Sequence, residues 1–285
     1  MRMTSVHLEV DDDDDKEKDK WKEVSFLMFL QGTLFTLLPY VYIEPKIRKR
    51  HKVLVRECMF SLMKAAVYLY VVNTSWIWLM RCLGGGVHQM LVSYTHQVAY
   101  STVFFIHSAT VALFHYQMQK GLLPLLTNDT LNVQVTFQDP FLASSAEDFW
   151  GHRWGLITRN VLALTVCAPA VKKTESPVVS AMAAFLISGA MHAYTVEVVF
   201  GVRAPHAVLF FVLHGVAVSL EKYWTLSGGR RPIRIISTLL WLLFGVLTLP
   251  LYFGTLARAS PQWLQAYLPD LGLLSLLKIP EFQCY

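Results

Sequence analysis

Long uncharged blocks, separated by shorter polar stretches, run along most of this 285-residue chain. Val24–Ile43 holds 20 residues without a charge, and Ile235–Ala257 holds 23. About 20 consecutive apolar residues form a helix long enough to cross the roughly 30 Å hydrocarbon core of a bilayer. We therefore expect both blocks to be transmembrane helices.

Four other blocks are mainly apolar, two of them with one charged residue each, and they bring the expected total to about six spans. They cover residues 58–80, 98–116, 178–200 and 205–220. A shorter apolar block at Leu156–Val171 is interrupted by Arg159 and Pro169, which favours a re-entrant or interfacial helix over a full span. The pattern predicts an all-α, polytopic transmembrane helix bundle of about six spans plus one re-entrant helix.

The polar segments indicate how the chain is divided and oriented. Residues 1–23 are strongly charged and typical of a disordered tail, and residues 24–285 are expected to form a single membrane domain. Positive residues favour the cytosol, which places the basic loop at 44–56 there. A re-entrant block at 156–171 would keep the basic stretch at 222–234 cytosolic as well, whereas a full crossing would make it lumenal. The sequence favours the first arrangement, with both termini lumenal.

Composition supports the membrane assignment and narrows the function. Hydrophobic residues make up 54% of the chain and charged residues 16%, against about 25% charged in soluble domains. The net charge of +5 forms no basic stripe, so no nucleic-acid partner is expected. The four cysteines form no CxxC pair, and the histidines show no helical metal-ligand spacing, so no metal site is expected.

His192 is the strongest candidate for chemistry because it lies near the middle of the apolar block at 178–200. A charge there costs about 2.5 kcal/mol or more, but a neutral histidine is tolerated and can act as a general base. Ser188 lies one turn earlier on the same helix face. Two interpretations are open at this point, a catalytic base or a structural histidine that is hydrogen-bonded between helices.

A second candidate segment, residues 148–154, concentrates aromatic and ionisable side chains just before an apolar block. Its members are Asp148, Phe149, Trp150, His152, Arg153 and Trp154. Aromatic residues and arginine also occur where a chain is simply anchored at the membrane interface, so this segment too has a structural interpretation. The same holds for His214, inside the block at 205–220.

Two motifs together carry a family resemblance. Glu147–Trp154 reads EDFWGHRW, and Ser188–His192, about 40 residues later, reads SGAMH. Together they resemble the wax synthase branch of the membrane-bound O-acyltransferase (MBOAT) superfamily. Phe210–Gly215 is similar to that branch as well, so the core motifs lie within residues 143–220.

The resemblance implies an MBOAT-like fold in the endoplasmic reticulum membrane and an acyl-CoA-dependent O-acyltransferase. Such an enzyme esterifies a lipophilic hydroxyl acceptor, a long-chain alcohol or a sterol, to give a wax ester or a sterol ester. Expected partners are therefore acyl-CoA, the alcohol and the bilayer, and an oligomer is compatible with the sequence. Acyl-CoA is a co-substrate, and no separate cofactor is expected.

The resemblance also assigns roles to residues. His192 would remove the acceptor's hydroxyl proton, with His152 and Asn160 as candidate assistants. Substrate binding would fall to the motif residues Asp148, Phe149, Trp150, Arg153, Trp154, Ser188 and His214. The CoA phosphates would be bound by cations from Arg153, Arg159, Lys172 and Lys173.

Two positions depart from the family pattern. Gly155 stands where relatives often carry Asn or His, and Ala193 stands where many plant relatives carry an acidic residue. The chain also has fewer expected helices before its first motif than most relatives. These departures support an alternative function, a catalytically silent MBOAT-like membrane protein with a lipid-binding or scaffolding role. A solute transporter would need an internal repeat or paired broken helices, and the sequence shows neither.

Overall fold

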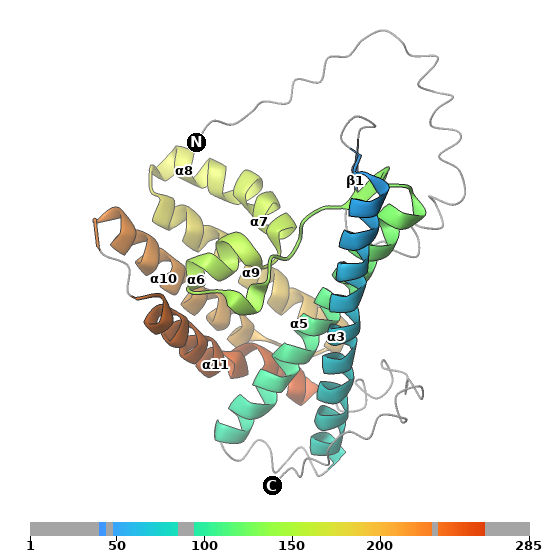
Figure 1. The fold of residues 1–285 in the computed structure, drawn as a ribbon. Helices are drawn as coiled ribbons and strands as arrows, with labels where there is room; N and C mark the ends of the chain where they lie inside the picture. Colours follow the sequence, from blue (N-terminus) through green and yellow to red (C-terminus); the bar gives the residue numbers. More distant parts are fainter. Residues whose placement is uncertain (1–39, 44–47, 85–93, 230–232, 260–285) are drawn as a thin grey trace. The chain divides into compact units, whose positions relative to one another are not determined.

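The computed structural model describes residues 40–43, 48–84, 94–229 and 233–259. The chain divides into two units, Met1–Tyr40 and Val41–Tyr285, and the second contains the elements that form the site. The predicted tail at 1–23 and the predicted span at 24–43 lie outside the described residues, apart from the last four residues of that span. Figure 1 shows the chain with its helices labelled.

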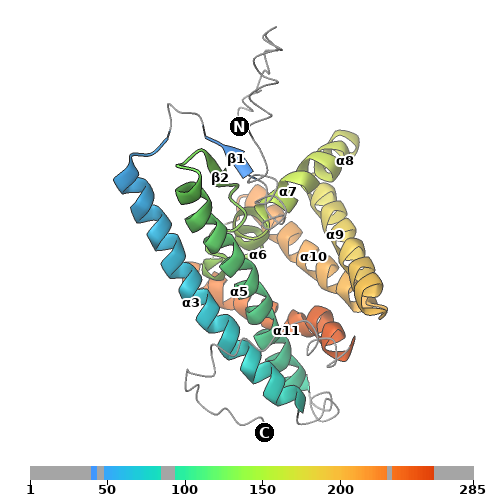
Figure 2. The same cartoon turned by 90° about the vertical axis from the view of Figure 1, so that its right-hand side faces the viewer.

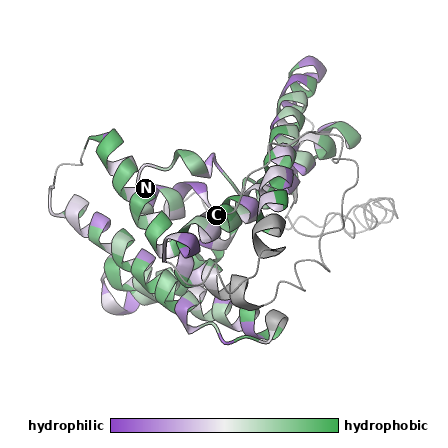
Figure 3. Cartoon of the chain, turned by 90° about the horizontal axis from the view of Figure 1, so that it is seen from below, coloured by the Kyte–Doolittle hydropathy of each residue, from purple (hydrophilic) through white to green (hydrophobic). Residues whose placement is uncertain are grey.

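Four helices of the described residues are long and apolar enough to cross a membrane. They are α5 (Tyr94–Leu126), α9 (Pro177–Phe200), α10 (Pro205–Leu226) and α11 (Arg234–Ala259). Each contains one of the blocks predicted to span, so the expectation of an all-α, polytopic bundle is confirmed. In Figure 3 much of the helical ribbon is green, at the hydrophobic end of the scale, with hydrophilic residues in purple between.

The α3 helix (His51–Gly84) contains another predicted span, 58–80. By length and composition, however, α3 is not among the helices apolar enough to cross a membrane. It begins earlier than predicted because Lys and Arg are good helix formers, so the basic residues that end an apolar block do not end a helix. α3 runs beside α5 in both Figure 1 and Figure 2. A buried hydrogen bond of 3.0 Å between Ser75 Oγ and His107 Nδ1 joins the two helices.

Between α5 and α9 the chain forms short elements rather than a plain polar loop. They are β2 (Leu131–Val133), which pairs with β1 (Tyr40–Tyr42), then η2 (Pro140–Leu142), α6 (Ala146–Asp148), η3 (Phe149–Arg153), α7 (Leu156–Leu162), η4 (Ala163–Cys167) and α8 (Ala168–Thr174). Both η3 and η4 are π-helical turns, a rare geometry that is frequent at functional sites.

The chain bends by 91° between Ala146–Arg153 and Leu156–Thr174. The second arm contains the predicted re-entrant block and is helical throughout, since α7, η4 and α8 follow one another without a gap. Counted as one span, the bent pair brings the candidate spans of the described residues to five. A re-entrant path for this arm stays a prediction.

Two glycines let α9 and α10 approach closely. A Cβ atom on Gly189 would lie 3.1 Å from Phe211 Cβ and 3.2 Å from Val208 Cα. A Cβ atom on Gly215 would lie 2.9 Å from Phe185 Cβ. Small residues at helix contacts are a common device in membranes, where close packing stabilises association. This contact fixes the spacing of the two helices that contribute His192 and His214.

Candidate active site

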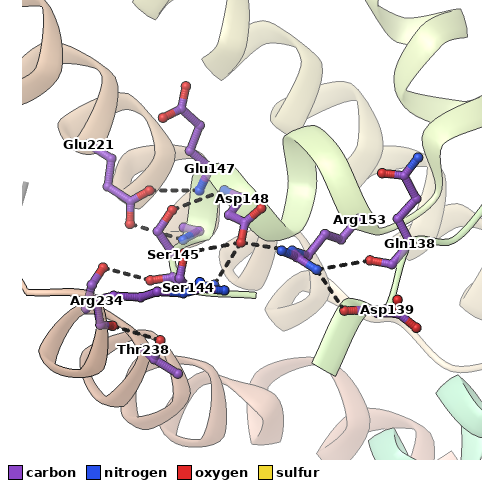
Figure 4. A network of polar contacts seen from close by, with 12 residues as sticks. Gln138, Asp139, Ser144, Ser145, Glu147, Asp148, Arg153, Glu221, Arg234 and Thr238 are labelled. Atoms are coloured by element: carbon purple, nitrogen blue, oxygen red, sulfur yellow. Dashed lines mark hydrogen bonds and ion pairs between the residues drawn. The ribbon is translucent and has the colours of Figure 1, made fainter. Parts of the chain in front are cut away.

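The EDFWGHRW segment, Glu147–Trp154, is called the aromatic motif below. Hydrogen bonds from α10 and α11 hold the chain at and just before its first residue. The Glu221 carboxylate of α10 accepts hydrogen bonds from the backbone amides of Ala146 (3.1 Å) and Glu147 (2.8 Å). It thereby caps the N-terminus of α6, where free N–H groups attract negative charge. The Ser237 hydroxyl of α11 donates to the Ser144 carbonyl at 2.7 Å. Figure 4 shows the Glu221 contacts from α10.

Asp148 and Arg153 stabilise the turn between α6 and η3. Arg153 Nε donates to Asp148 Oδ2 at 2.9 Å, and the same oxygen accepts from the Ser144 amide at 2.9 Å (Figure 4). Burial raises the pKa of the Asp148 carboxyl, but these hydrogen bonds outweigh burial and hold the pKa below its usual value. Arg153 also donates to the carbonyls of Gln138 and Asp139, so its guanidinium is engaged in the turn itself.

A hydrogen-bonded chain connects the motif to α10 and α11 in the protein interior. The indole N–H of Trp150 donates to His214 Nδ1 at 3.0 Å, and His214 Nε2 lies 3.0 Å from Thr248 Oγ1. An indole nitrogen can only donate, so His214 carries its proton on Nε2 and donates it to Thr248. Thr248 in turn donates to the Phe244 carbonyl at 2.9 Å. Both nitrogens of His214 are therefore occupied, and its role is to hold Trp150 in place.

A cavity of about 660 Å³ lies between the motif segment and helices α5, α9, α10 and α11. This volume falls within the range of about 300–1,000 Å³ that is usual for small-molecule sites. Its walls are mainly aromatic and aliphatic. Arg159 is the single Asp, Glu, Lys or Arg among the described residues that line it. The arrangement suits an apolar ligand with a charged group at one end.

His192 lines this cavity with a nitrogen available for proton transfer. Its Nδ1 lies 2.7 Å from the Ser188 carbonyl oxygen, one turn back on α9. A carbonyl can only accept, so Nδ1 carries the proton and Nε2 keeps a free lone pair. The ring lies against Phe211, with centroids 4.5 Å apart, and against Tyr252 at 5.7 Å. The result is a neutral imidazole with a fixed tautomer at an apolar cavity, which is the form that a general base needs.

Two histidines of the described helices, His107 and His115, lie away from the cavity that His192 lines. His115 makes the same bond to the carbonyl four residues earlier, at 2.8 Å, and is exposed as His192 is, but it does not line the cavity. His107 is buried between α3 and α5 and lies outside the cavity lining too. Placement at the cavity therefore distinguishes His192 from His107 and His115, and a ring nitrogen without a hydrogen bond to another group of the described residues distinguishes it from His214.

The structure brings most of the predicted site residues together and leaves four of them apart. The cavity lining includes Phe149, Trp150, Trp154, Ser188, His192 and His214. Four others are not in the lining, namely Asp148, His152, Arg153 and Asn160. His152 is exposed, and the Asn160 amide oxygen accepts a hydrogen bond of 3.1 Å from Arg159 Nε. Neither residue is therefore placed at the cavity to assist His192.

Gly155, the departure from the family pattern, also lines the cavity. It is the N-cap of α7, with a left-handed φ of +57°, and a Cβ atom added to it would meet nothing within 4 Å. Glycine adopts this conformation without a steric penalty, and Asn tolerates it better than most residues do. The backbone at this position therefore accommodates either glycine or the Asn of relatives.

Glu221 and Thr248 form hydrogen bonds with the site, and the sequence reasoning missed both. Each is a polar residue in or beside a long apolar block, and its partner lies far away along the chain. The available signal was the presence of such a residue in an otherwise apolar helix, since polar groups there need partners. Among the described residues, no group of three or more His, Cys, Asp or Glu is placed to hold a metal ion.

Comparison with known proteins shows that the segment containing most of the site matches a protein family. Residues 133–213 match the sequence model of the membrane bound O-acyl transferase family. This segment includes the aromatic motif and His192, and it ends one residue before His214. The resemblance that the motifs predict is confirmed over this segment.

Curated relatives agree with that match. The chain is 35% identical over 128 residues to the probable long-chain-alcohol O-fatty-acyltransferase 1 of Arabidopsis thaliana, covering 40% of this chain and 36% of that protein. It is 30% identical over 129 residues to the acyl-CoA–sterol O-acyltransferase 1 of the same plant, covering 41% and 37%. It is 38% identical over 100 residues to the long-chain-alcohol O-fatty-acyltransferase of Simmondsia chinensis, covering 32% and 28%. The chain thus matches less than two fifths of the length of each relative.

Proposed function

We propose that this chain is an acyl-CoA-dependent O-acyltransferase that esterifies a lipophilic alcohol, either a long-chain alcohol or a sterol. The observation that carries the proposal is the free Nε2 of His192 at an apolar cavity, within the segment that matches the family. Relatives named for transfer to long-chain alcohols and to sterols support this substrate class.

The proposed reaction needs one base. Nε2 of His192 takes the proton of the acceptor hydroxyl as the oxygen attacks the thioester carbonyl carbon of acyl-CoA. The C–S bond then breaks, the CoA thiolate leaves, and the imidazolium returns the proton to the sulfur. A thioester is already activated, so one positioned base contributes about 10²–10⁴-fold without a covalent acyl-enzyme.

The cavity supplies the other requirements. Its apolar walls accommodate the hydrocarbon chains and exclude water, which would otherwise compete with the alcohol. Arg159 lines the cavity and is exposed, and its guanidinium, which also donates to the Gly151 carbonyl and the Asn160 amide oxygen, carries the charge that suits a CoA phosphate. Lys172 and Lys173 are exposed at the end of α8 and form a second basic group in the same arm.

The test is acyl transfer in microsomes from cells that lack related enzymes. Labelled acyl-CoA is offered with a panel of long-chain alcohols and sterols to the wild type, to His192→Ala and to His115→Ala. His115 is the matched control because it makes the same backbone bond away from the cavity. We expect His192→Ala to lose about 10²–10⁴-fold of the activity and His115→Ala to keep it.

Equal ester formation by the wild type and His192→Ala, at equal protein levels, would refute the base assignment. No ester from the wild type with any acceptor would favour the silent, lipid-binding alternative, for which Gly155 is the supporting observation.

We also propose that the protein lies in the endoplasmic reticulum membrane with the 120–154 segment in the cytosol. Asn128, in the sequence Asn-Asp-Thr, is exposed, so it is accessible to glycosylation if its loop is lumenal. We expect no mobility change of the microsomal protein on glycosidase treatment. A shift that Asn128→Gln abolishes would place this loop in the lumen and contradict the orientation.

A further inference from the structure

The cavity face of α11 has one gap in a row of large side chains. Trp241, Gly245, Leu249 and Tyr252 follow one another at single-turn spacing, and all four line the cavity. Three of them fill their part of the wall. Gly245 leaves its part open.

Packing against a neighbour does not explain this glycine. Glycine inside a helix costs about 1 kcal/mol relative to alanine, so an unforced one is unfavourable. At Gly189 and Gly215 the reason is close contact between α9 and α10, where a Cβ atom would lie within about 3 Å of Phe211 or Phe185. A Cβ atom on Gly245 would meet nothing within 4 Å. The space that Gly245 leaves free therefore belongs to the cavity.

Gly245 is separated from the reacting atoms. Tyr252, whose ring lies 5.7 Å from that of His192, is seven residues further along α11. A helix rises about 1.5 Å per residue, so Gly245 lies about 10 Å along the helix from the residue that contacts the base. A group at this distance meets a hydrocarbon chain well away from the ester carbonyl.

We propose that Gly245 determines the length of the hydrocarbon chain that the cavity accepts. This inference rests on the proposed transferase function and adds a specificity-determining residue to it. The chain runs along α11 past the gap, and a side chain at position 245 would occupy the space of its distal methylenes. Chain length is then controlled from α11 and the chemistry from α9.

The test compares Gly245→Ala and Gly245→Leu with the wild type over a series of acyl-CoA chain lengths and, separately, of alcohol chain lengths. Burial of one methylene contributes about 0.8 kcal/mol, or roughly fourfold in kcat/KM. Leucine adds four carbons, so we expect it to lower kcat/KM for the longest substrates by more than tenfold relative to short ones. The series that responds, acyl or alcohol, identifies which chain passes the gap. Leu243→Phe adds bulk on the exposed side of the same helix and should leave both profiles unchanged.

A binding measurement separates failure of this inference from failure of the transferase function. Thermal stabilisation of the purified protein by the same acyl-CoA and alcohol series needs no turnover. Suppose that the wild type makes no ester, but long chains stabilise the wild type and fail to stabilise Gly245→Leu. This result would overturn the transferase function and uphold the proposed role of Gly245. Unchanged chain-length profiles in Gly245→Leu, in both transfer and binding and with normal folding, would overturn the proposed role of Gly245.

Discussion

The structure predicts how much the hydrogen bond between Trp150 and His214 contributes to the free energy of unfolding. His214 is 3% exposed, and its ring accepts from the indole N–H at 3.0 Å. In His214→Leu, the indole N–H loses its acceptor in an apolar surrounding, which costs about 1–3 kcal/mol. Thr248 loses little because its hydroxyl still donates to the Phe244 carbonyl. We expect the free energy of unfolding to fall by about 1–3 kcal/mol.

A double-mutant cycle isolates this bond from lost packing. Trp150→Phe removes the donor and keeps an aromatic ring, so the double variant has neither partner left unpaired. Hydrogen bonds between membrane helices contribute about 0.6 kcal/mol on average and up to about 1.7. We therefore expect a coupling energy of about 0.5–1.7 kcal/mol between the two substitutions.

The assay is unfolding of the purified protein in detergent, by SDS titration at constant temperature, for the wild type, both single variants and the double variant. His206→Leu, an exposed histidine near the start of α10, controls for the exchange of histidine for leucine. Additive effects, with a coupling energy below about 0.3 kcal/mol, would mean that the bond does not form and would refute the tautomer assigned to His214.

Three further predictions concern the backbone and the charges around the site. Gly155→Asn should keep the thermal unfolding temperature of the wild type, whereas Gly155→Val should lower it, because the left-handed φ excludes a branched side chain; equal effects would argue against this backbone geometry. Gly189→Leu should destabilise by about 1–3 kcal/mol or prevent folding, since its side chain would collide with Phe211, and normal yield and stability would contradict the packing of α9 on α10. Asp148→Asn should lower the free energy of unfolding at neutral pH, because the depressed pKa of Asp148 means that its carboxylate form stabilises the folded protein. This contribution is lost as the pH falls below 3.8, the usual pKa of the group. The difference in stability between variant and wild type, measured by unfolding over a series of pH values, should therefore shrink there. A pH-independent difference would mean that the Asp148 carboxylate is not stabilised by its hydrogen bonds from Ser144 and Arg153.

The sequence was sufficient to find four of the long helices and the histidine that lines the cavity on α9, because both depend on local pattern. Uncharged blocks marked α5, α9, α10 and α11, and a lone histidine in an apolar block singled out His192. The ends of α3 were missed because charged residues mark the limit of an apolar block and not the limit of a helix. The α5 helix extends beyond the predicted span at 98–116 on both sides and continues past Lys120.

The roles of Arg153 and His214 could not be read from the sequence because they depend on non-helical or long-range contacts. Residues five apart lie on different faces of an α-helix, but the π turn of η3 contributes to bringing Arg153 onto Asp148. Arg153 was therefore assigned to phosphate binding, while the structure engages it in an ion pair of 2.9 Å. The bond between His214 and Trp150 joins residues 64 positions apart, and no local pattern specifies it.

The two attachments of the motif to α10 have a consequence for movement and for sequence length. His214 and Glu221 are seven residues apart, so the motif is held at two points about 10 Å apart on one rigid rod. A motion that admits substrate must therefore carry α10 and the motif together, or occur between them and the rest of the bundle. One residue inserted between positions 214 and 221 would rotate the second attachment by about 100°, out of reach of α6. The number of residues between these two attachments on α10 therefore cannot change by one without separating the motif from one of them.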